Sequence, residues 1–118
     1  MNNNSLKKDL TATQDLSETP YDPFSYTSST NRKFKLEEVI LHFSTTVTET
    51  VTVSRVSKSG SNYTHVLAKR GLSAEQDFIF RPTGECNFQD GDEVKVECTD
   101  ANHTGVLFMT IKRSEILL

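Results

Sequence analysis

The residues best suited to chemistry gather in one stretch, FRPTGECNFQDGDEVKVEC, at positions 80–98. Four of its carboxylates, Glu85, Asp90, Asp92 and Glu93, could together supply the oxygen ligands that a calcium ion requires. Their spacing fits no EF-hand loop. Gly91, between two aspartates, is typical of a turn before a strand, in which Asp side chains accept hydrogen bonds from nearby amides. We therefore predict a turn here, with no metal and no cofactor.

The same stretch holds both cysteines of the chain, Cys86 and Cys98. The N-terminus lacks the apolar segment of a secretory signal, which favours reduced thiols. If Asp90 and Gly91 form a tight hairpin, the two cysteines lie about three residues, or roughly 10 Å, out of register. We expect both to act as small apolar fillers, because a disulfide would need a longer connection.

Three histidines, His42, His65 and His103, are the other residues that could serve a metal or a nucleophile. Each stands in an expected strand or loop without a second ligand two or four residues away. A zinc or catalytic site would need the fold to bring them together with a cysteine or carboxylate. We predict surface or half-buried histidines, and a protein that is not an enzyme.

Charge and hydropathy exclude several classes of protein. Thirteen Lys and Arg against sixteen Asp and Glu give a formal charge of −3, with both signs scattered along the chain. The sequence has no basic stripe of the kind that binds nucleic acid, so we expect no nucleic-acid partner. The apolar runs are too short for a membrane span, so we expect no membrane partner either.

The composition favours strands, because Ser and Thr make up 27 of 118 residues while Trp is absent. From Arg32 onward, alternating runs separated by turn residues predict six strands. These runs are FKLEEVILHFS, ETVTVSRVS, THVLAKRGL, DFIFRP, DEVKVECT and GVLFMTIKR. A further short strand is expected around Phe24 and Tyr26. We predict an all-β chain, an antiparallel β-sandwich of jelly-roll or immunoglobulin-like kind, over residues 32–118.

Two of these runs carry clear predictions about their faces. In DEVKVECT, Val94, Val96 and Cys98 should share one face. In FKLEEVILHFS, Leu36, Ile40 and His42 can share a face, while Val39, Leu41 and Phe43 crowd the other face or mark a bulge.

Residues 1–31 are rich in Asn, Ser, Thr and Pro and show no clear periodicity. They predict an extended N-terminal arm outside the sandwich, so a chain beginning at Arg32 should fold by itself. The spacing of Leu6 and Leu10 allows one marginal helical turn. Tyr21, Pro23, Phe24 and Tyr26 form a small apolar cluster, which we predict to bind a partner.

The sequence FRPTGECNFQDGDEVKV, followed by NHTGVLFMTI, resembles small accessory virion proteins of tailed bacteriophages, of the decoration or cement type. The segment FKLEEVILHFS is similar to an early strand of such proteins, and the resemblance covers residues 34–113. Cys86 and Cys98 depart from the pattern, in which aliphatic residues are more usual. The resemblance implies a jelly-roll-like sandwich that decorates or cements a capsid, or lines the region between head and tail.

These observations predict a virion structural protein on the capsid surface, assembled in the host cytoplasm. Its partners would be adjacent major capsid protein subunits and further copies of itself, as a dimer or trimer, because a small core gains stability by docking. The alternative is a glycan- or receptor-binding β-sandwich module displayed on a phage particle. Tyr63 and Arg55 are the residues whose replacement would test that alternative.

Overall fold

A computed structural model of the chain describes residues 5–17, 24–27, 32–99 and 104–116. Strands and one short 3-10 turn account for its regular structure. The elements are β1 (Ser5–Asp15), β2 (Phe24–Thr27), β3 (Phe34–Val47), β4 (Thr50–Val56), η1 (Ser61–Tyr63), β5 (His65–Gly71), β6 (Glu75–Phe80), β7 (Asn87–Phe88), β8 (Glu93–Cys98) and β9 (Val106–Ile116). In the described part of the chain, no helix has the length and apolar character needed to span a membrane.

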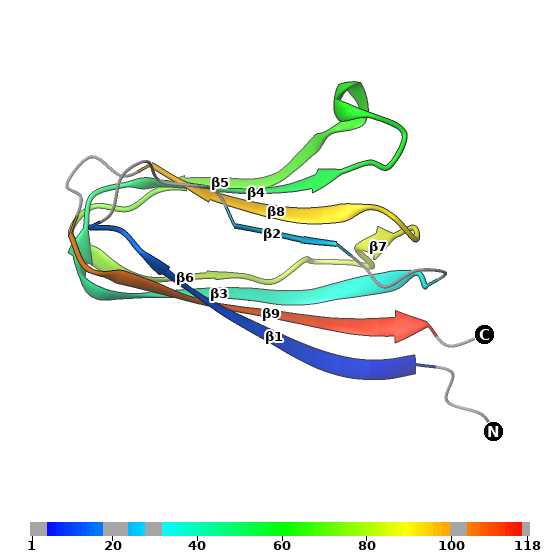
Figure 1. The fold of residues 1–118 in the computed structure, drawn as a ribbon, viewed down its shortest axis with the longest axis horizontal. Coiled ribbons are helices and arrows are strands. Elements are labelled where there is room, and N and C mark those ends of the chain that lie inside the picture. Colours follow the sequence, from blue (N-terminus) through cyan, green and yellow to red (C-terminus); the bar gives the residue numbers. More distant parts are fainter. Residues whose placement is uncertain (1–4, 18–23, 28–31, 100–103, 117–118) are drawn as a thin grey trace.

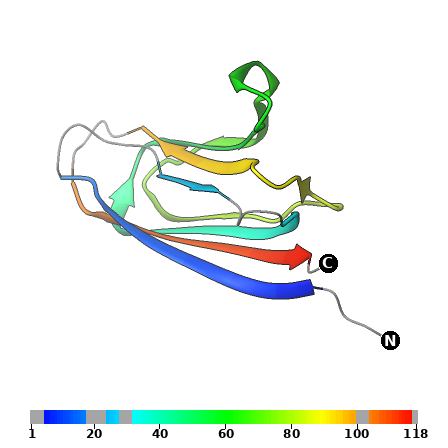
Figure 2. The ribbon, with the colours of Figure 1, turned by 45° about the vertical axis from the view of Figure 1, so that its right-hand side comes forward.

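The strands form two sheets that lie face to face (Figure 1). Sheet A has the order β1-β9-β3-β6, with β7 also paired to β3, and sheet B has the order β2-β8-β4-β5. The paired strands are antiparallel. Successive strands change sheet at each connection except β4–β5 and β6–β7, and the two layers remain distinct in the rotated view of Figure 2. The predicted all-β antiparallel sandwich is confirmed.

The core fills the space between the sheets with the inward side chains of both. In β8, Val94, Val96 and Cys98 are buried, as their alternation predicted. In β9, Leu107 and Met109 are buried in the same way. Each such side chain contributes about 1.5–3 kcal/mol on leaving water, so these two central strands hold the layers together.

A β-bulge decides which residues of β3 enter the core. The pairing of β3 with β9 shifts register between Leu36 and Glu38, so Leu36 and Val39 both point inward. Beyond the bulge the inward residues are Val39, Leu41 and Phe43, and Ile40 lies on the other face. The predicted grouping of Leu36 with Ile40 is therefore wrong, and the bulge that was its stated alternative is present.

The N-terminal residues differ from the expected extended arm. Residues 5–15 form β1, which pairs with β9 along its whole length, from Ser5 opposite Ile116 to Asp15 opposite Val106. The helical turn at Leu6 and Leu10 is therefore wrong, because β9 offers backbone partners that a single helical turn lacks. The strand expected around Tyr26 is present as β2 in sheet B. Both sheets thus begin before residue 32.

Residues 80–98 do not form the hairpin that was assumed for the two cysteines. The short strand β7 pairs with β3 in sheet A, whereas β8 lies in sheet B. Cys86 and Cys98 are thiols without a disulfide between them. Cys98 is buried and its thiol donates to the carbonyl oxygen of Thr99 at 3.1 Å, while Cys86 is half-buried.

Replacing Cys98 with alanine should lower the free energy of unfolding by about 1–3 kcal/mol, because a buried side chain is truncated. The same change at Cys86 should cost less.

Burial raises the pKa of the Cys86 thiol above its usual value, with Arg55 opposing, so iodoacetamide should modify it slowly in the folded protein. Urea unfolding with and without reductant should give the same midpoint, and a lower midpoint with reductant would reveal a disulfide.

The turn before β8 is held by one carboxylate. Asp92 accepts hydrogen bonds from the backbone amides of Lys58, at 3.0 Å, and of Gln89, at 2.9 Å. Gly91 adopts a φ of 88°, which a residue with a side chain rarely adopts. The predicted turn is confirmed for Asp92 and Gly91. Asp90 differs, because it contacts the ammonium group of Lys58 at 3.3 Å.

Replacing Asp92 with asparagine should cost about 1–3 kcal/mol, because the new amide nitrogen cannot accept one of the two backbone hydrogen bonds. Asp90→Asn is the matched control, and its exposed ion pair should contribute about 0.5 kcal/mol or less. Urea unfolding measures both. Added calcium should leave the melting temperature unchanged, and a rise of several degrees would contradict the assignment of Asp92 to the turn.

Candidate functional site

The aromatic cluster predicted to bind a partner is only partly described. Tyr21 and Pro23 lie outside the described residues, and Phe24 is known only by its backbone, in β2 opposite Val96. Tyr26 turns into the sandwich, where its ring contacts Phe34 edge-on with centroids 6.1 Å apart. Because its hydroxyl is buried, Tyr26 packs within the fold and does not present an anchor to a neighbour.

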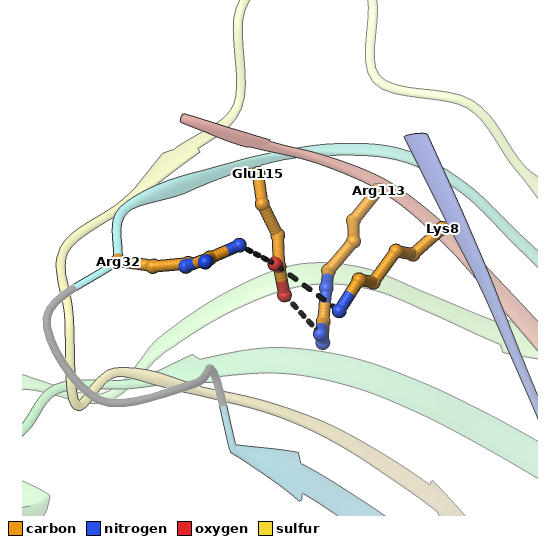
Figure 3. A network of polar contacts seen from close by, with 4 residues as sticks. All are labelled: Lys8, Arg32, Arg113 and Glu115. Carbon is orange, nitrogen blue, oxygen red and sulfur yellow. Dashed lines mark hydrogen bonds and ion pairs between the residues drawn. The ribbon is translucent and has the colours of Figure 1, made fainter. Parts of the chain in front are cut away.

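Tyr26 lies beside a cluster of charges, which we call the Glu115 cluster. The carboxylate of Glu115 is surrounded by the cationic groups of Lys8, Arg32 and Arg113, which all point toward it (Figure 3). Lys8 and Arg32 approach its Oε1 atom at 3.4 and 3.2 Å, and Arg113 contacts its Oε2 atom. The cluster ties β1, the residues before β3, and β9 to one another.

The local sequence explains how these charges come to lie inside. Arg113 and Glu115 continue the alternation of Leu107, Met109 and Ile111, so they point toward the opposite sheet. Their side chains are 3% and 0% exposed. Their burial was not predicted from the sequence, because charged residues usually lie in solvent. The continued period of two was the signal that could have found them.

Burial removes the charged groups of Arg113 and Glu115 from water, which costs free energy. Desolvation lowers the pKa of Arg113 from its usual value, while the charge of Glu115 opposes the shift. The guanidinium group stacks over the Tyr26 ring at 3.8 Å from the centroid, and its Nε and Nη1 atoms have no hydrogen-bond partner within the described residues. A buried cation held by one carboxylate depends strongly on that carboxylate. Loss of the Glu115 carboxylate would therefore leave Arg113 as a buried cation without its ion pair.

An open pocket lies beside the β4–β5 connection, where η1 projects from the sandwich (Figure 1). Its volume is about 440 Å³, and its lining includes Arg55, Lys58, Tyr63, His65 and Gln89. Tyr63 is 66% exposed, so its ring is available to a ligand. Arg55 uses its Nη1 atom to donate to the carbonyl oxygen of Asn87 at 3.3 Å. The structure thus brings Tyr63 and Arg55 together.

The outer face of sheet A carries a second candidate surface. Cross-strand pairing places Ile40 beside Ile79, and His42 between Asp77 and Phe108. Ile79 and Phe108 are 49% and 46% exposed. His42 stacks on Phe108 with centroids 6.4 Å apart.

Charged side chains on this outer face are already paired. His42 Nδ1 lies 2.7 Å from Asp77 Oδ1. Farther along the strands, Arg81 contacts Glu38, and Lys112 lies 3.9 Å from Asp9. Ile40, Ile79 and Phe108, which we call the apolar row, thus lie beside paired charges, as apolar residues do at many contact surfaces of proteins.

Groups for metal binding do not gather in the described residues. There, no three His, Cys, Asp or Glu side chains lie close enough together to hold a metal ion. His42 and His65 lie in different sheets, and His103 lies outside the described residues.

No protein-family model matches the chain, and no curated protein matches it. Among solved structures, the chain is similar to the Drosophila NLP-core, described for its pentamer formation and histone binding. The identity is 9%, the TM-score is 0.47, and the match covers 90% of this chain and 97% of that one.

Proposed function

We propose that this chain is a structural protein of a virus particle that decorates or cements the capsid by binding adjacent major capsid protein subunits. It works as a binding protein without catalysis, on the capsid surface, after assembly in the host cytoplasm. The resemblance of residues 34–113 to phage accessory proteins motivates the choice of partner. We further propose that the sandwich is a jelly roll, because two antiparallel sheets, here of five and four strands, whose connections repeatedly cross between layers are typical of that fold.

The observation that carries the proposal is the apolar row on the outer face of sheet A. Ile79 and Phe108 stand about half exposed on β6 and β9. On β3, which lies between these strands, Ile40 is opposite Ile79 and His42 is opposite Phe108. Central apolar anchors with a polar rim are the pattern that contributes most to binding at protein interfaces. Here the rim charges pair with each other, as Arg81 does with Glu38, so a docking subunit need not supply partners for them.

Sheet A is also suited to hold such a row rigidly. Phe108 and Ile79 alternate with Leu107 and Phe78, which are buried in the core. The backbone beneath the anchors is therefore fixed by packing on its inner side, and little conformational freedom is lost when a partner docks.

Capsid binding by a surface variant tests this proposal. Ile79→Ser combined with Phe108→Ser should weaken co-sedimentation with capsids of the encoding virus by about ten-fold or more, because two apolar anchors are lost. Val66→Ser is the matched control, because Val66 is 52% exposed on β5 in sheet B. Circular dichroism should show both variants folded. Equal binding by the double variant and the control would remove the outer face of sheet A from the contact.

A glycan- or receptor-binding module is the second candidate, and the pocket beside η1 favours it. Sugar rings stack on exposed aromatic side chains, and their hydroxyl groups bond to polar side chains. Tyr63 and Arg55 offer both kinds of contact in one pocket of about 440 Å³. A glycan-array signal lost in both Tyr63→Ala and Arg55→Ala, but kept in the sheet A double variant, would support this candidate over capsid binding.

A further inference from the structure

Among the strands that the structure describes, none pairs with the outer edge of β1, which is a long strand. β1 contains 11 residues and lies at the end of sheet A, beyond β9 (Figure 1). Its pairing with β9 runs from Ser5 to Asp15 without a register shift. Within the described residues, β9 is the strand to which β1 pairs, so the backbone groups directed away from β9 form a regular row.

β1 lacks most of the features that prevent edge strands from pairing with other chains. Proteins usually protect such edges with proline, a bulge or a very short strand. SLKKDLTATQD contains no proline, its pairing shows no bulge, and residues 10–14 carry no charge. Leu6, on the same strand, is 41% exposed. Such an edge is suited to accept one more antiparallel strand.

We propose that the added strand is β1 of a second copy, paired antiparallel about a two-fold axis at Thr11. The five-stranded sheets A of the two copies would then join into one continuous sheet through the two β1 strands. This goes beyond the proposed function, because it concerns self-association of the purified chain and requires no capsid.

The charges of β1 select this register. With Thr11 on the axis, Lys7 of one copy lies opposite Asp15 of the other, which places opposite charges side by side. Thr11 then faces Thr11, and Leu10 faces Ala12 on the inner side. Nine residues of each copy, 7–15, pair within the strand, at about one backbone hydrogen bond per residue pair.

Neighbouring registers are less favourable. An axis at Lys8 or at Asp9 places that residue against its own copy, and an axis at Ala12 places Asp9 against Asp15. Like charges directly opposite each other destabilise a sheet. An axis at Leu10 avoids repulsion but places Lys7 opposite Thr13, so the ion pair is lost. A two-fold axis midway between two neighbouring residues of β1 would place the inner side chains of one copy opposite the outer side chains of the other.

The side chains that would form the ion pair are accessible. The Lys7 side chain is 81% exposed and lies 3.6 Å from Glu37. Hydrogen bonds from the side chain and the backbone of Ser17 lower the pKa of Asp15, so its carboxyl group is charged at neutral pH. Because the two-fold axis is perpendicular to the sheet, the outer faces of sheet A from both copies would lie on the same side.

Cysteine cross-linking of the full chain tests the register, in a Cys86→Ser background. Thr11→Cys should form a disulfide-linked dimer on mild oxidation, because its two copies face each other across the axis. Thr13→Cys is the matched control and should cross-link slowly alone, because it faces Asp9. A mixture of Asp9→Cys and Thr13→Cys chains should cross-link. Equal rates for Thr11→Cys and Thr13→Cys would overturn the register.

Sedimentation velocity of the unmodified protein tests self-association. We expect a dimer that Asp15→Lys dissociates, by placing Lys7 against a second lysine, and that the exchanged pair Lys7→Asp with Asp15→Lys restores. A monomer at every concentration, or a dimer indifferent to both variants, would overturn the proposal. Capsid binding is measured separately with the same variants, so a monomer that binds capsids would leave the proposed function standing.

Discussion

Glu115→Gln should lower the free energy of unfolding by about 3–5 kcal/mol, the loss typical of breaking a buried ion pair by removing one partner. The Glu115 side chain is 0% exposed and contacts Lys8, Arg32 and Arg113. Lys8 and Arg32 are more than a third exposed and can turn to water. Arg113 is 3% exposed and would remain as a buried cation without its carboxylate.

Urea unfolding of two further variants makes this prediction specific. Glu97→Gln is the matched control, because Glu97 is 43% exposed and lies 3.9 Å from Lys95, so its loss should cost about 0.5 kcal/mol or less. Arg113→Met combined with Glu115→Leu should recover much of the loss, because apolar replacement of a whole buried pair is often close to neutral. If Glu115→Gln unfolded like the control, the cluster would contribute little to stability.

Removal of residues 1–17 should leave the chain largely unfolded. The deletion exposes the edge of β9 from Val106 to Ile116, and it removes Lys8 from the Glu115 cluster. It also removes Leu16, which is 1% exposed and whose burial contributes about 1.5–3 kcal/mol. The free energy of unfolding of a small domain is only about 5–15 kcal/mol, so these combined losses are a large share of it.

This outcome is the reverse of the expectation that a chain beginning at Arg32 folds by itself. Circular dichroism and urea unfolding measure it, with a chain lacking residues 1–4 as the control that keeps all of β1. If the chain lacking residues 1–17 unfolded cooperatively at the same urea midpoint as the full chain, the sandwich would fold independently of β1.

The strands whose pattern is local were predictable from the sequence. DEVKVECT alternates apolar and charged residues, and β8 buries Val94, Val96 and Cys98 accordingly. The bulge in β3 was one of two stated alternatives, because six apolar residues cannot alternate over FKLEEVILHFS without one. In these strands each residue's own polarity determines its face.

β1 was missed because its structure depends on a distant partner. SLKKDLTATQD has few apolar residues, and its strand conformation follows from pairing with β9, about a hundred residues away in the chain. Arg113 and Glu115 were missed because they bury charge, which polarity patterns assign to solvent. The ion pairs of Glu115 with Lys8, Arg32 and Arg113 join segments that are distant in sequence, so they are visible only in the folded structure.

The candidate binding surfaces likewise depend on strand order. Ile79 and Phe108 belong to strands that are separate in sequence, and β3 between them brings them onto one face. Tyr63 and Arg55, from the β4–β5 connection and from β4, line one pocket together with Gln89, which follows β7. Each residue was visible in the sequence, but its neighbours could not be inferred without the topology.

The most direct test of the proposed capsid role is a binding titration of the purified full chain against intact capsids of the encoding virus. The amount bound should saturate at a fixed ratio to the major capsid protein, and the Ile79→Ser, Phe108→Ser variant should fail to reach it. Absence of saturable binding by folded, full-length protein would contradict a decorating or cementing function.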